Sequence, residues 1–115
     1  MSFEDNSKPI YLQIADSLCD RILSGELGEE EKIPSVREYA ADIGVNPNTV
    51  VRAYDILSTN GIIFQKRGIG YFISDGAKDK VKDALKKKFF AEILPGIRKT
   101  MSLLGIKPSE AFPEE

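Results

Sequence analysis

Residues 35–54 read SVREYAADIGVNPNTVVRAY, and this stretch decides the fold of the 115-residue chain. Ser35, followed three residues later by Glu38, has the spacing of a capping box, which begins a helix. Gly44 is suited to end that helix in a left-handed conformation, and Asn46 followed by Pro47 is suited to begin the next one. The stretch therefore predicts two short helices joined by a tight turn.

Each of these helices carries one apolar stripe at three- and four-residue spacing. The two stripes are Val36, Tyr39, Ala40 and Ile43, then Val50, Ala53, Tyr54 and Leu57. Because both can be buried in one core, the pattern predicts a helix-turn-helix, whose second helix enters a groove of DNA. The outward polar positions, Arg37, Asn48, Thr49 and Arg52, are candidates for contacts with bases and phosphates. Solvated surface is the alternative for all four, and an ion pair with a nearby acid is a further one for Arg52.

The flanking segments complete a winged helix-turn-helix. A helix is expected from Pro9 to Gly25, with an apolar side of Tyr11, Ile14, Ala15, Leu18 and Ile22, followed by an acidic loop over residues 26–32. Two short strands, 62–65 and 71–73, flank Lys66-Arg67-Gly68-Ile69-Gly70 and predict a hairpin with a basic tip, the wing. A phosphate-binding nucleotide loop is a weak alternative, since these glycines neither follow a parallel strand nor open a helix.

From Ala77 onward the pattern is helical again, first charged and then apolar. An apolar stripe follows helical spacing through a segment in which Pro95 predicts a kink; its members are Phe90, Leu94, Ile97, Met101 and Leu104. A stripe of this size predicts a dimer interface, and folding back over the first domain is the alternative. We therefore expect a mainly α chain with a small β-hairpin: a winged helix-turn-helix DNA-binding domain over residues 1–75 and a C-terminal helical dimerisation tail over residues 76–115.

The charge distribution constrains the DNA hypothesis. The chain has a net charge of -2, which divides into -5 for residues 1–75 and +3 for residues 76–115. A DNA-binding face on the negative segment requires its few cations to gather on one side. Arg37, Arg52, Lys66 and Arg67 all occupy motif positions, whereas four glutamates lie together in the loop at 26–31. We expect strongly salt-dependent binding.

Composition argues against an enzyme. The chain has no histidine, and its lone cysteine, Cys19, lies on an apolar helical side, where we expect a small core residue in a reducing compartment. Neither a metal nor a cofactor is expected. The amino terminus lacks the pattern of a signal peptide, and no apolar run approaches the roughly 20 residues of a membrane span, so we expect a soluble cytoplasmic protein.

The ordered motifs from Pro9 to Ser74 resemble those of the GntR family of bacterial transcription regulators, and within it the short YtrA-like group. The matching segments are PIYLQIA at 9–15, KIPSVREYA at 32–40, VNPNTVVRAY at 45–54 and KRGIGYFI at 66–73. The resemblance implies a homodimeric repressor on a palindromic operator, with a small two-helix tail, and relatives often control neighbouring transporter operons.

The same resemblance assigns residue roles. It places Ser35 and Arg37 at phosphate and groove contacts, Asn46, Asn48, Thr49 and Arg52 at the start of the recognition helix, and Arg67, Gly68 and Gly70 in the wing. Many relatives in other subgroups carry arginine where this chain has Val51, so their base readout does not transfer.

Two questions stay open at this stage. A winged-helix module that binds protein rather than DNA is the alternative function, although a basic wing beside two glycines suits a phosphate backbone better. A small-molecule effector, if one exists, would have to bind between the tail helices or where tail and wing meet.

Overall fold

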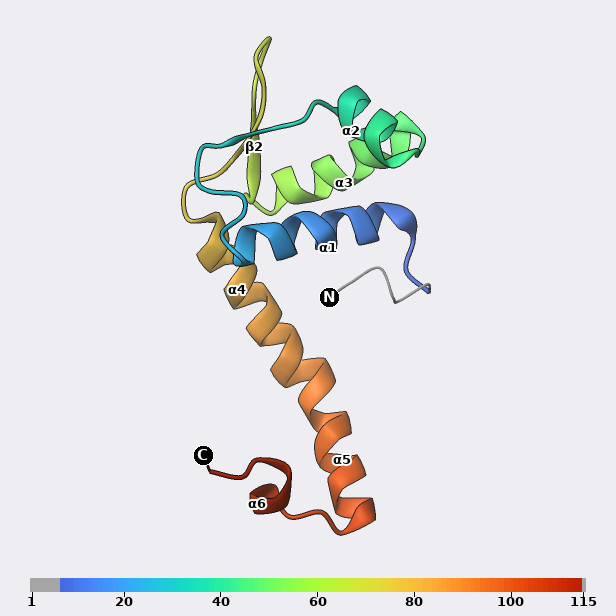
Figure 1. Cartoon of the computed structure of the whole chain (residues 1–115), viewed down its shortest axis with the longest axis vertical. Coiled ribbons are helices and arrows are strands. Elements are labelled where there is room, and N and C mark those ends of the chain that lie inside the picture. Colours follow the sequence, from blue (N-terminus) through green and yellow to red (C-terminus); the bar gives the residue numbers. More distant parts are fainter. Residues whose placement is uncertain (1–6, 115) are drawn as a thin grey trace. The chain divides into compact units, whose positions relative to one another are not determined.

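The computed structural model describes residues 7–114 and divides into two compact units, one ending at Lys82 and one beginning at Asp83 (Figure 1). Unit 1 contains three helices, three strands and the start of a fourth helix: α1 (Ile10–Leu23), β1 (Lys32–Ile33), α2 (Val36–Ile43), α3 (Pro47–Thr59), β2 (Ile63–Lys66), β3 (Gly70–Ile73) and α4 (Ala77–Lys88). Unit 2 contains the rest of α4, a π-helical turn (Phe89–Ile93), α5 (Leu94–Leu104) and α6 (Pro108–Ala111). The mainly α fold class with a small antiparallel sheet is confirmed.

The predicted helix boundaries are confirmed by their hydrogen bonds. The Ser35 Oγ accepts from the Glu38 N–H at 3.1 Å, and the Glu38 carboxylate accepts from the Ser35 N–H at 3.2 Å, which completes the capping box. Gly44 ends α2 at φ 71°. The Asn46 Oδ1 then accepts from the Asn48 N–H at 2.8 Å, with Pro47 at the first position of α3.

The core of unit 1 lies between α1, α3 and the inner face of the sheet. Helix α1 lies alongside α3 (Figure 1). Fully or almost fully buried side chains come from every layer: Ile14, Leu18, Ile22, Val50, Tyr54, Leu57, Ile33, Ile63 and Ile73. Ala77 and Val81 of α4 are also buried, which is why the first unit extends past residue 75 to Lys82.

One predicted core residue, Ile43, is 41% exposed. Helix α2 has only eight residues, so its stripe is buried at Ala40, while Ile43 at its last position lies on the rim of a groove that it shares with Ile10 and Val45. Ile43, at the last position of α2, is therefore less covered by α3 than Ala40 is.

The predicted hairpin is part of a three-stranded antiparallel sheet in the order β1-β3-β2. Strands β2 and β3 pair with Phe64 opposite Phe72, and β1 pairs with the other edge of β3 with Ile33 opposite Tyr71. The prediction of a loop over residues 26–32 is therefore wrong at its last residue, because Lys32 begins β1. A two-residue strand carries too little pattern to be seen without its partner.

The acidic loop is tied to the base of the wing. The Glu30 N–H donates to the Ile73 carbonyl at 2.7 Å, and the Ile73 N–H donates to the Glu31 carbonyl at 2.9 Å. The Glu29 carboxylate accepts from the Gly76 N–H at 2.7 Å, next to the start of α4. The glutamates therefore lie at the end of β3 opposite the hairpin turn.

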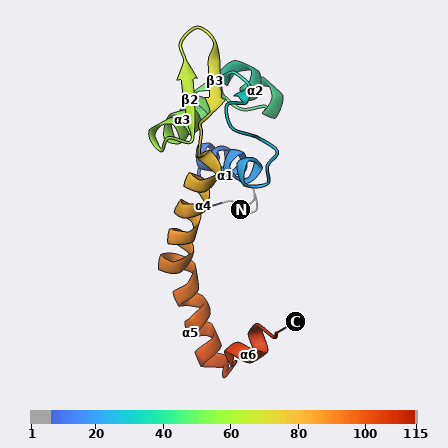
Figure 2. The same cartoon turned by 90° about the vertical axis from the view of Figure 1, so that its left-hand side faces the viewer.

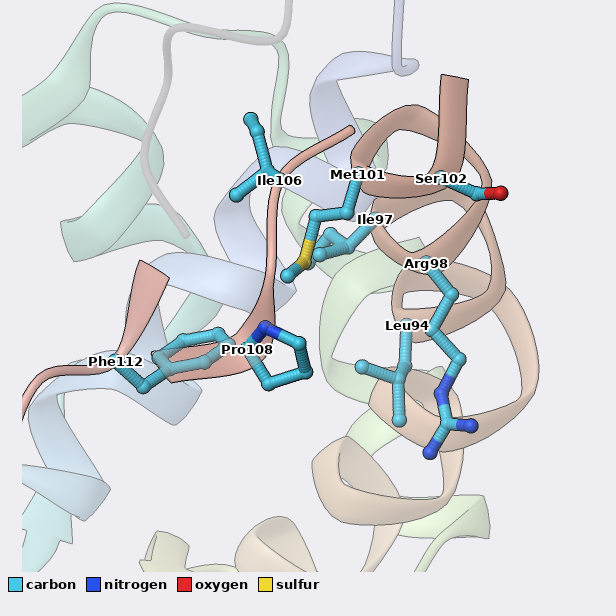
Figure 3. A pocket seen from close by; sticks show the side chains of 8 residues that line it. All are labelled: Leu94, Ile97, Arg98, Met101, Ser102, Ile106, Pro108 and Phe112. Carbon is cyan, nitrogen blue, oxygen red and sulfur yellow. The ribbon is translucent and has the colours of Figure 1, made fainter. Parts of the chain in front are cut away.

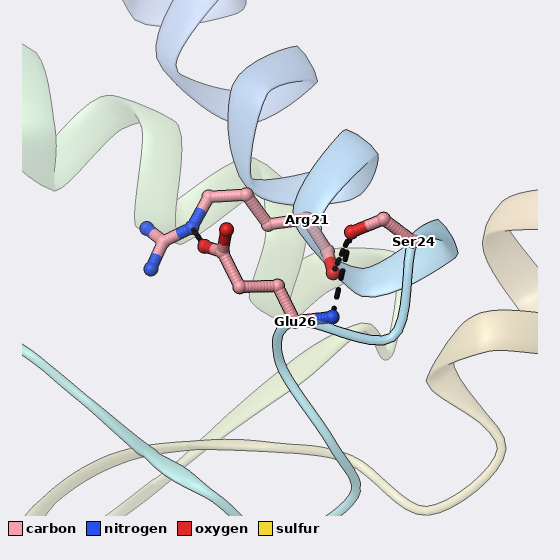
Figure 4. A network of polar contacts seen from close by, with 3 residues as sticks. All are labelled: Arg21, Ser24 and Glu26. Atoms are coloured by element: carbon pink, nitrogen blue, oxygen red, sulfur yellow. Dashed lines mark hydrogen bonds and ion pairs between the residues drawn. The ribbon is translucent and has the colours of Figure 1, made fainter.

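The end of α1 is closed by local polar contacts (Figure 4). The Ser24 hydroxyl donates to the Arg21 carbonyl at 3.0 Å, and the Glu26 N–H approaches the Ser24 Oγ at 3.4 Å. The Arg21 side chain pairs with the Glu26 carboxylate. The charge of Arg21 is thus paired with that of Glu26, just after the end of α1.

Between α4 and α5, just before Pro95, the helical hydrogen-bond pattern changes. The Leu94 N–H donates to the Phe89 carbonyl, five residues back, which makes residues 89–93 a π-helical turn. Proline has no N–H, and its ring collides with the carbonyl four residues earlier in a regular helix, so a widened turn accommodates it. A kink was predicted at Pro95, and the structure shows a π-helical turn directly before it. Helix α5 ends at Gly105, with φ 68°, and the short α6 follows. Among residues 7–114, no helix is long and apolar enough to cross a bilayer.

Replacing Ser35 by alanine should lower the free energy of unfolding by about 1 kcal/mol, because the first turn of α2 loses its cap. Urea unfolding followed by far-ultraviolet circular dichroism measures the change. An unchanged midpoint would show that the capping box does not stabilise α2.

Glu38→Gln is the matched control, since glutamine also completes a capping box. The hydrogen bonds from Ser35 lower the pKa of the Glu38 carboxyl below its ordinary value of 4.5. Its contribution is therefore present above 4.5 and is lost as the pH falls through the folded pKa. The glutamine variant should keep the cap and lack this acid-dependent loss.

Candidate nucleic-acid interface

The helix-turn-helix is held together by Tyr54 of α3. Its ring is fully buried and contacts Tyr71 edge-on, with centroids 4.9 Å apart, and Tyr39 at 6.3 Å. Its hydroxyl donates to the Pro34 carbonyl at 2.7 Å. Burial raises the pKa of Tyr54 well above its usual range, so the hydroxyl stays protonated and holds the Pro34 carbonyl just before α2.

The first group of predicted contact residues lies at the start of α2. Ser35 is the N-cap and Arg37 is exposed in the first helical turn. The Ser35 side chain is already engaged with the Glu38 N–H, but a hydroxyl can accept there and still donate to a phosphate oxygen.

The second group lies at the start of α3. Asn46 is the N-cap, Asn48 is exposed and Thr49 is half-buried in the first turn. Arg52 follows Asn48 by four residues and Thr49 by three, so these side chains share one side of the helix. The Asn46 amide oxygen is used by its cap, whereas its amide nitrogen stays available as a donor.

Within residues 7–114, Arg52 forms no ion pair, which was the alternative considered for this residue. Its guanidinium carbon lies 4.0 Å from the centre of the Tyr11 ring, in the first turn of α1. Sequence reasoning placed Tyr11 only on the apolar side of that helix, because helical periodicity does not reveal that Tyr11 lies beneath a side chain of α3.

The third group forms the wing. Lys66 ends β2, and its ammonium lies 4.8 Å from the centre of the Phe72 ring, while Arg67 is exposed in the turn. Gly68 and Gly70 have φ values of 79° and 143°, which side-chain-bearing residues rarely adopt. A Cβ on Gly70 would also come within 3.0 Å of the Lys32 side chain.

The hairpin tip and α2 lie at the same end of unit 1, away from the start of α4 (Figure 1 and Figure 2). The candidates lie at the starts of α2 and α3, two helices that contact each other, and in the wing, whose strand β2 also contacts α3. Arg52 lies over the Tyr11 ring of α1.

The cations of unit 1 differ in whether an acid neutralises them. Lys8 pairs with Asp16 at 2.7 Å, and Arg21 pairs with Glu26. Within residues 7–114, no ion pair is formed by Arg37, Arg52, Lys66 or Arg67. The cations at the motif positions therefore keep their charge available, as do Lys32, Lys78, Lys80 and Lys82 of the same unit, although the unit as a whole is negative.

No feature of the described residues suggests catalysis. Residues 7–114 contain no cluster of three or more acidic or cysteine side chains suited to a metal ion. Cys19 is half-buried rather than part of the core, and burial, with Asp16 and Asp20 nearby, raises its pKa to about 11. A thiol with so high a pKa stays protonated near neutral pH and is a poor nucleophile.

The predicted interface residues of the tail are distributed over α5 and the π-helical turn. Phe90, Leu104 and Ile97 are 64%, 68% and 37% exposed, while Leu94 and Met101 are half-buried. The last two, with Ile97, face Pro108 and Phe112 across a groove of about 470 Å³ between α5 and α6 (Figure 3). No residue from 83 to 114 is buried.

The sequence of this winged fold matches the model of the bacterial regulatory proteins of the gntR family over residues 10–73. The chain belongs to the GntR family. It is 45% identical over 105 residues to the HTH-type transcriptional regulator YhcF of Bacillus subtilis, a match that covers 91% of this chain and 85% of that protein. It is also 47% identical over 73 residues to the repressor YtrA of the same organism, with 64% and 56% covered.

Solved structures agree with this assignment. A GntR-family regulator from Bacteroides thetaiotaomicron has a TM-score of 0.76 at 45% identity and covers 90% of this chain and 89% of its own. The DNA-binding domain of AraR in complex with operator ORX1 has a TM-score of 0.56 at 27% identity, covering 58% and 81%. This GntR protein is therefore a bacterial transcriptional regulator with a winged-helix DNA-binding domain, not an enzyme, and its relatives and tail fit the YtrA-like group.

Tyr54→Phe should lower the free energy of unfolding by about 1–2 kcal/mol, because the Pro34 carbonyl loses its donor in a partly buried position. Urea unfolding of Tyr39→Phe supplies the matched control, since the Tyr39 hydroxyl has no hydrogen-bond partner within residues 7–114. Equal small changes in both variants would contradict the anchoring role of Tyr54.

Proposed function

We propose that this GntR protein is a homodimeric repressor that binds a palindromic operator through the starts of α2 and α3 and the wing. The observation that carries this proposal is that, among residues 7–114, Arg37, Arg52, Lys66 and Arg67 form no ion pair, on a unit that is negative overall. Guanidinium and ammonium groups left unpaired in this way are suited to phosphate oxygens.

Each element has a distinct task in this proposal. The start of α3 enters the major groove, where the short side chains of Asn48 and Thr49 reach base edges. Arg37 and Arg67 bind phosphates on either side of that groove, and Ser35 adds a hydroxyl donor. The glycines of the wing let the backbone at Arg67 approach the DNA closely.

A protein-binding winged helix is the competing function. A protein partner would need an apolar or acidic surface complementary to the wing. A chain with that function would show no preference for a DNA sequence. The operator-bound AraR domain favours DNA, because its fold matches over more than half of this chain.

Dimerisation through the tail is supported by the composition of unit 2. Its exposed apolar side chains include Phe89, Phe90, Ile93, Leu103 and Leu104, and residues 83–114 have no buried core of their own. A second copy can cover such a surface symmetrically. The pair would then present two recognition helices about 34 Å apart, which is the spacing of successive major grooves on one face of DNA.

The groove between α5 and α6 is the place we propose for a small-molecule effector. It is lined mainly by apolar side chains, with Arg98 and Ser102 as its polar members (Figure 3). An effector there would act by changing the geometry of the dimer. Control of a neighbouring transporter operon stays a prediction from the family resemblance.

Arg37→Ala combined with Arg67→Ala should weaken operator binding at least tenfold. The slope of log affinity against log salt concentration should also become less steep, by the amount expected for the loss of about two phosphate contacts. Fluorescence anisotropy with the DNA upstream of the protein's own gene, across a salt series, measures both quantities.

Arg21→Ala is the matched control for this experiment, because Arg21 is an arginine of the same unit whose charge is paired with Glu26. Its affinity should stay within about twofold of the parent protein. Equal affinity of the double variant and the parent would remove the proposed DNA-binding face.

Phe90→Asp should shift the protein from dimer to monomer, because a charged group would be placed within an apolar interface. Sedimentation velocity at micromolar concentration measures the oligomeric state. Ala91→Asp is the matched control, with the same added charge in the same helical turn but outside the apolar stripe. A parent protein that sediments only as a monomer would exclude the dimer.

A further inference from the structure

Tyr11 and Arg52 form a contact that neither the helix-turn-helix motif nor the wing accounts for. Arg52 lies on α3 on the side of Asn48 and Thr49, while Tyr11 is in the first turn of α1, outside the motif. The Arg52 guanidinium carbon is 4.0 Å from the centre of the Tyr11 ring. This distance is that of a cation–π contact.

Stacking on a ring occupies the face of a guanidinium and leaves its edge free. The five N–H donors of arginine lie in the guanidinium plane, so they point away from a ring that covers that plane. Within residues 7–114, the Arg52 guanidinium donates no hydrogen bond and forms no ion pair. Its donor edge therefore remains available to a phosphate or to a guanine.

The contact also limits how freely Arg52 can move. A long arginine side chain loses rotamer entropy when it binds, and part of that loss is met in advance when the side chain is already held. Tyr11 is suited to this task, because it is half-buried on α1, which itself packs along α3.

We propose that Tyr11 is a positioning residue for DNA binding, which holds the Arg52 guanidinium in the orientation that meets the operator. The inference rests on the proposed DNA-binding function. It adds α1 to the proposed DNA-binding surface, whereas α1 otherwise serves only to support the motif. The ring carries the effect, and the Tyr11 hydroxyl is not needed for it.

A double-mutant cycle on operator binding tests this role. Tyr11→Leu should weaken binding about two- to fivefold, and Arg52→Ala should weaken it about tenfold. In the Arg52→Ala background, Tyr11→Leu should have no further effect, because the ring then has no guanidinium to hold. Tyr11→Phe keeps the ring and should bind within about twofold of the parent.

Thermal unfolding of all four variants separates positioning from folding. A purely structural role for Tyr11 predicts that Tyr11→Leu weakens binding equally with and without Arg52, and that result would overturn the proposal. So would an unchanged or tighter affinity of Tyr11→Leu in a protein that binds its operator. A parent protein without operator binding would instead reject the proposed function, and this inference with it.

Discussion

The buried hydroxyl of Tyr54 is the contact on which the geometry of the DNA-binding unit depends. It joins α3 to the Pro34 carbonyl, while its ring packs between Tyr39 of α2 and Tyr71 of β3. One side chain thus sets the positions of the first motif helix, the recognition helix and the wing relative to one another. Because the hydroxyl is buried, its hydrogen bond cannot be exchanged for water without cost.

The second constraint is electrostatic. A unit with more acids than bases can bind DNA only if its charges are segregated, and pairing within the sheet separates part of the acidic loop from the tip of the wing. Backbone hydrogen bonds hold Glu30 and Glu31 at the base of the hairpin beside Ile73, while Arg67 lies in the turn at its tip. Lys8 and Arg21 form ion pairs, whereas Arg37, Arg52, Lys66 and Arg67 form none within the part of the chain that the structure describes.

Unit 2, the tail, differs from unit 1 in having no buried core among the residues described. Its helices bury no residue within unit 2, so apolar side chains such as Phe90 and Leu104 gain little from folding alone. The π-helical turn before Pro95 keeps the helical path continuous where a proline would interrupt it. These exposed apolar side chains are the physical basis for proposing a second copy as the partner of this unit.

The sequence by itself determined what local chemistry controls. Ser35, Glu38, Gly44 and Asn46 set the helix ends, and the spacing of Val50 and Leu57 set the buried side of the recognition helix, because capping and periodicity act within a few residues. Only the tertiary structure decided that Lys32 and Ile33 form a strand, that Ile43 is exposed, and that Arg52 stacks on Tyr11. Each of these depends on residues distant in the chain, whose approach is fixed by packing rather than by any local pattern.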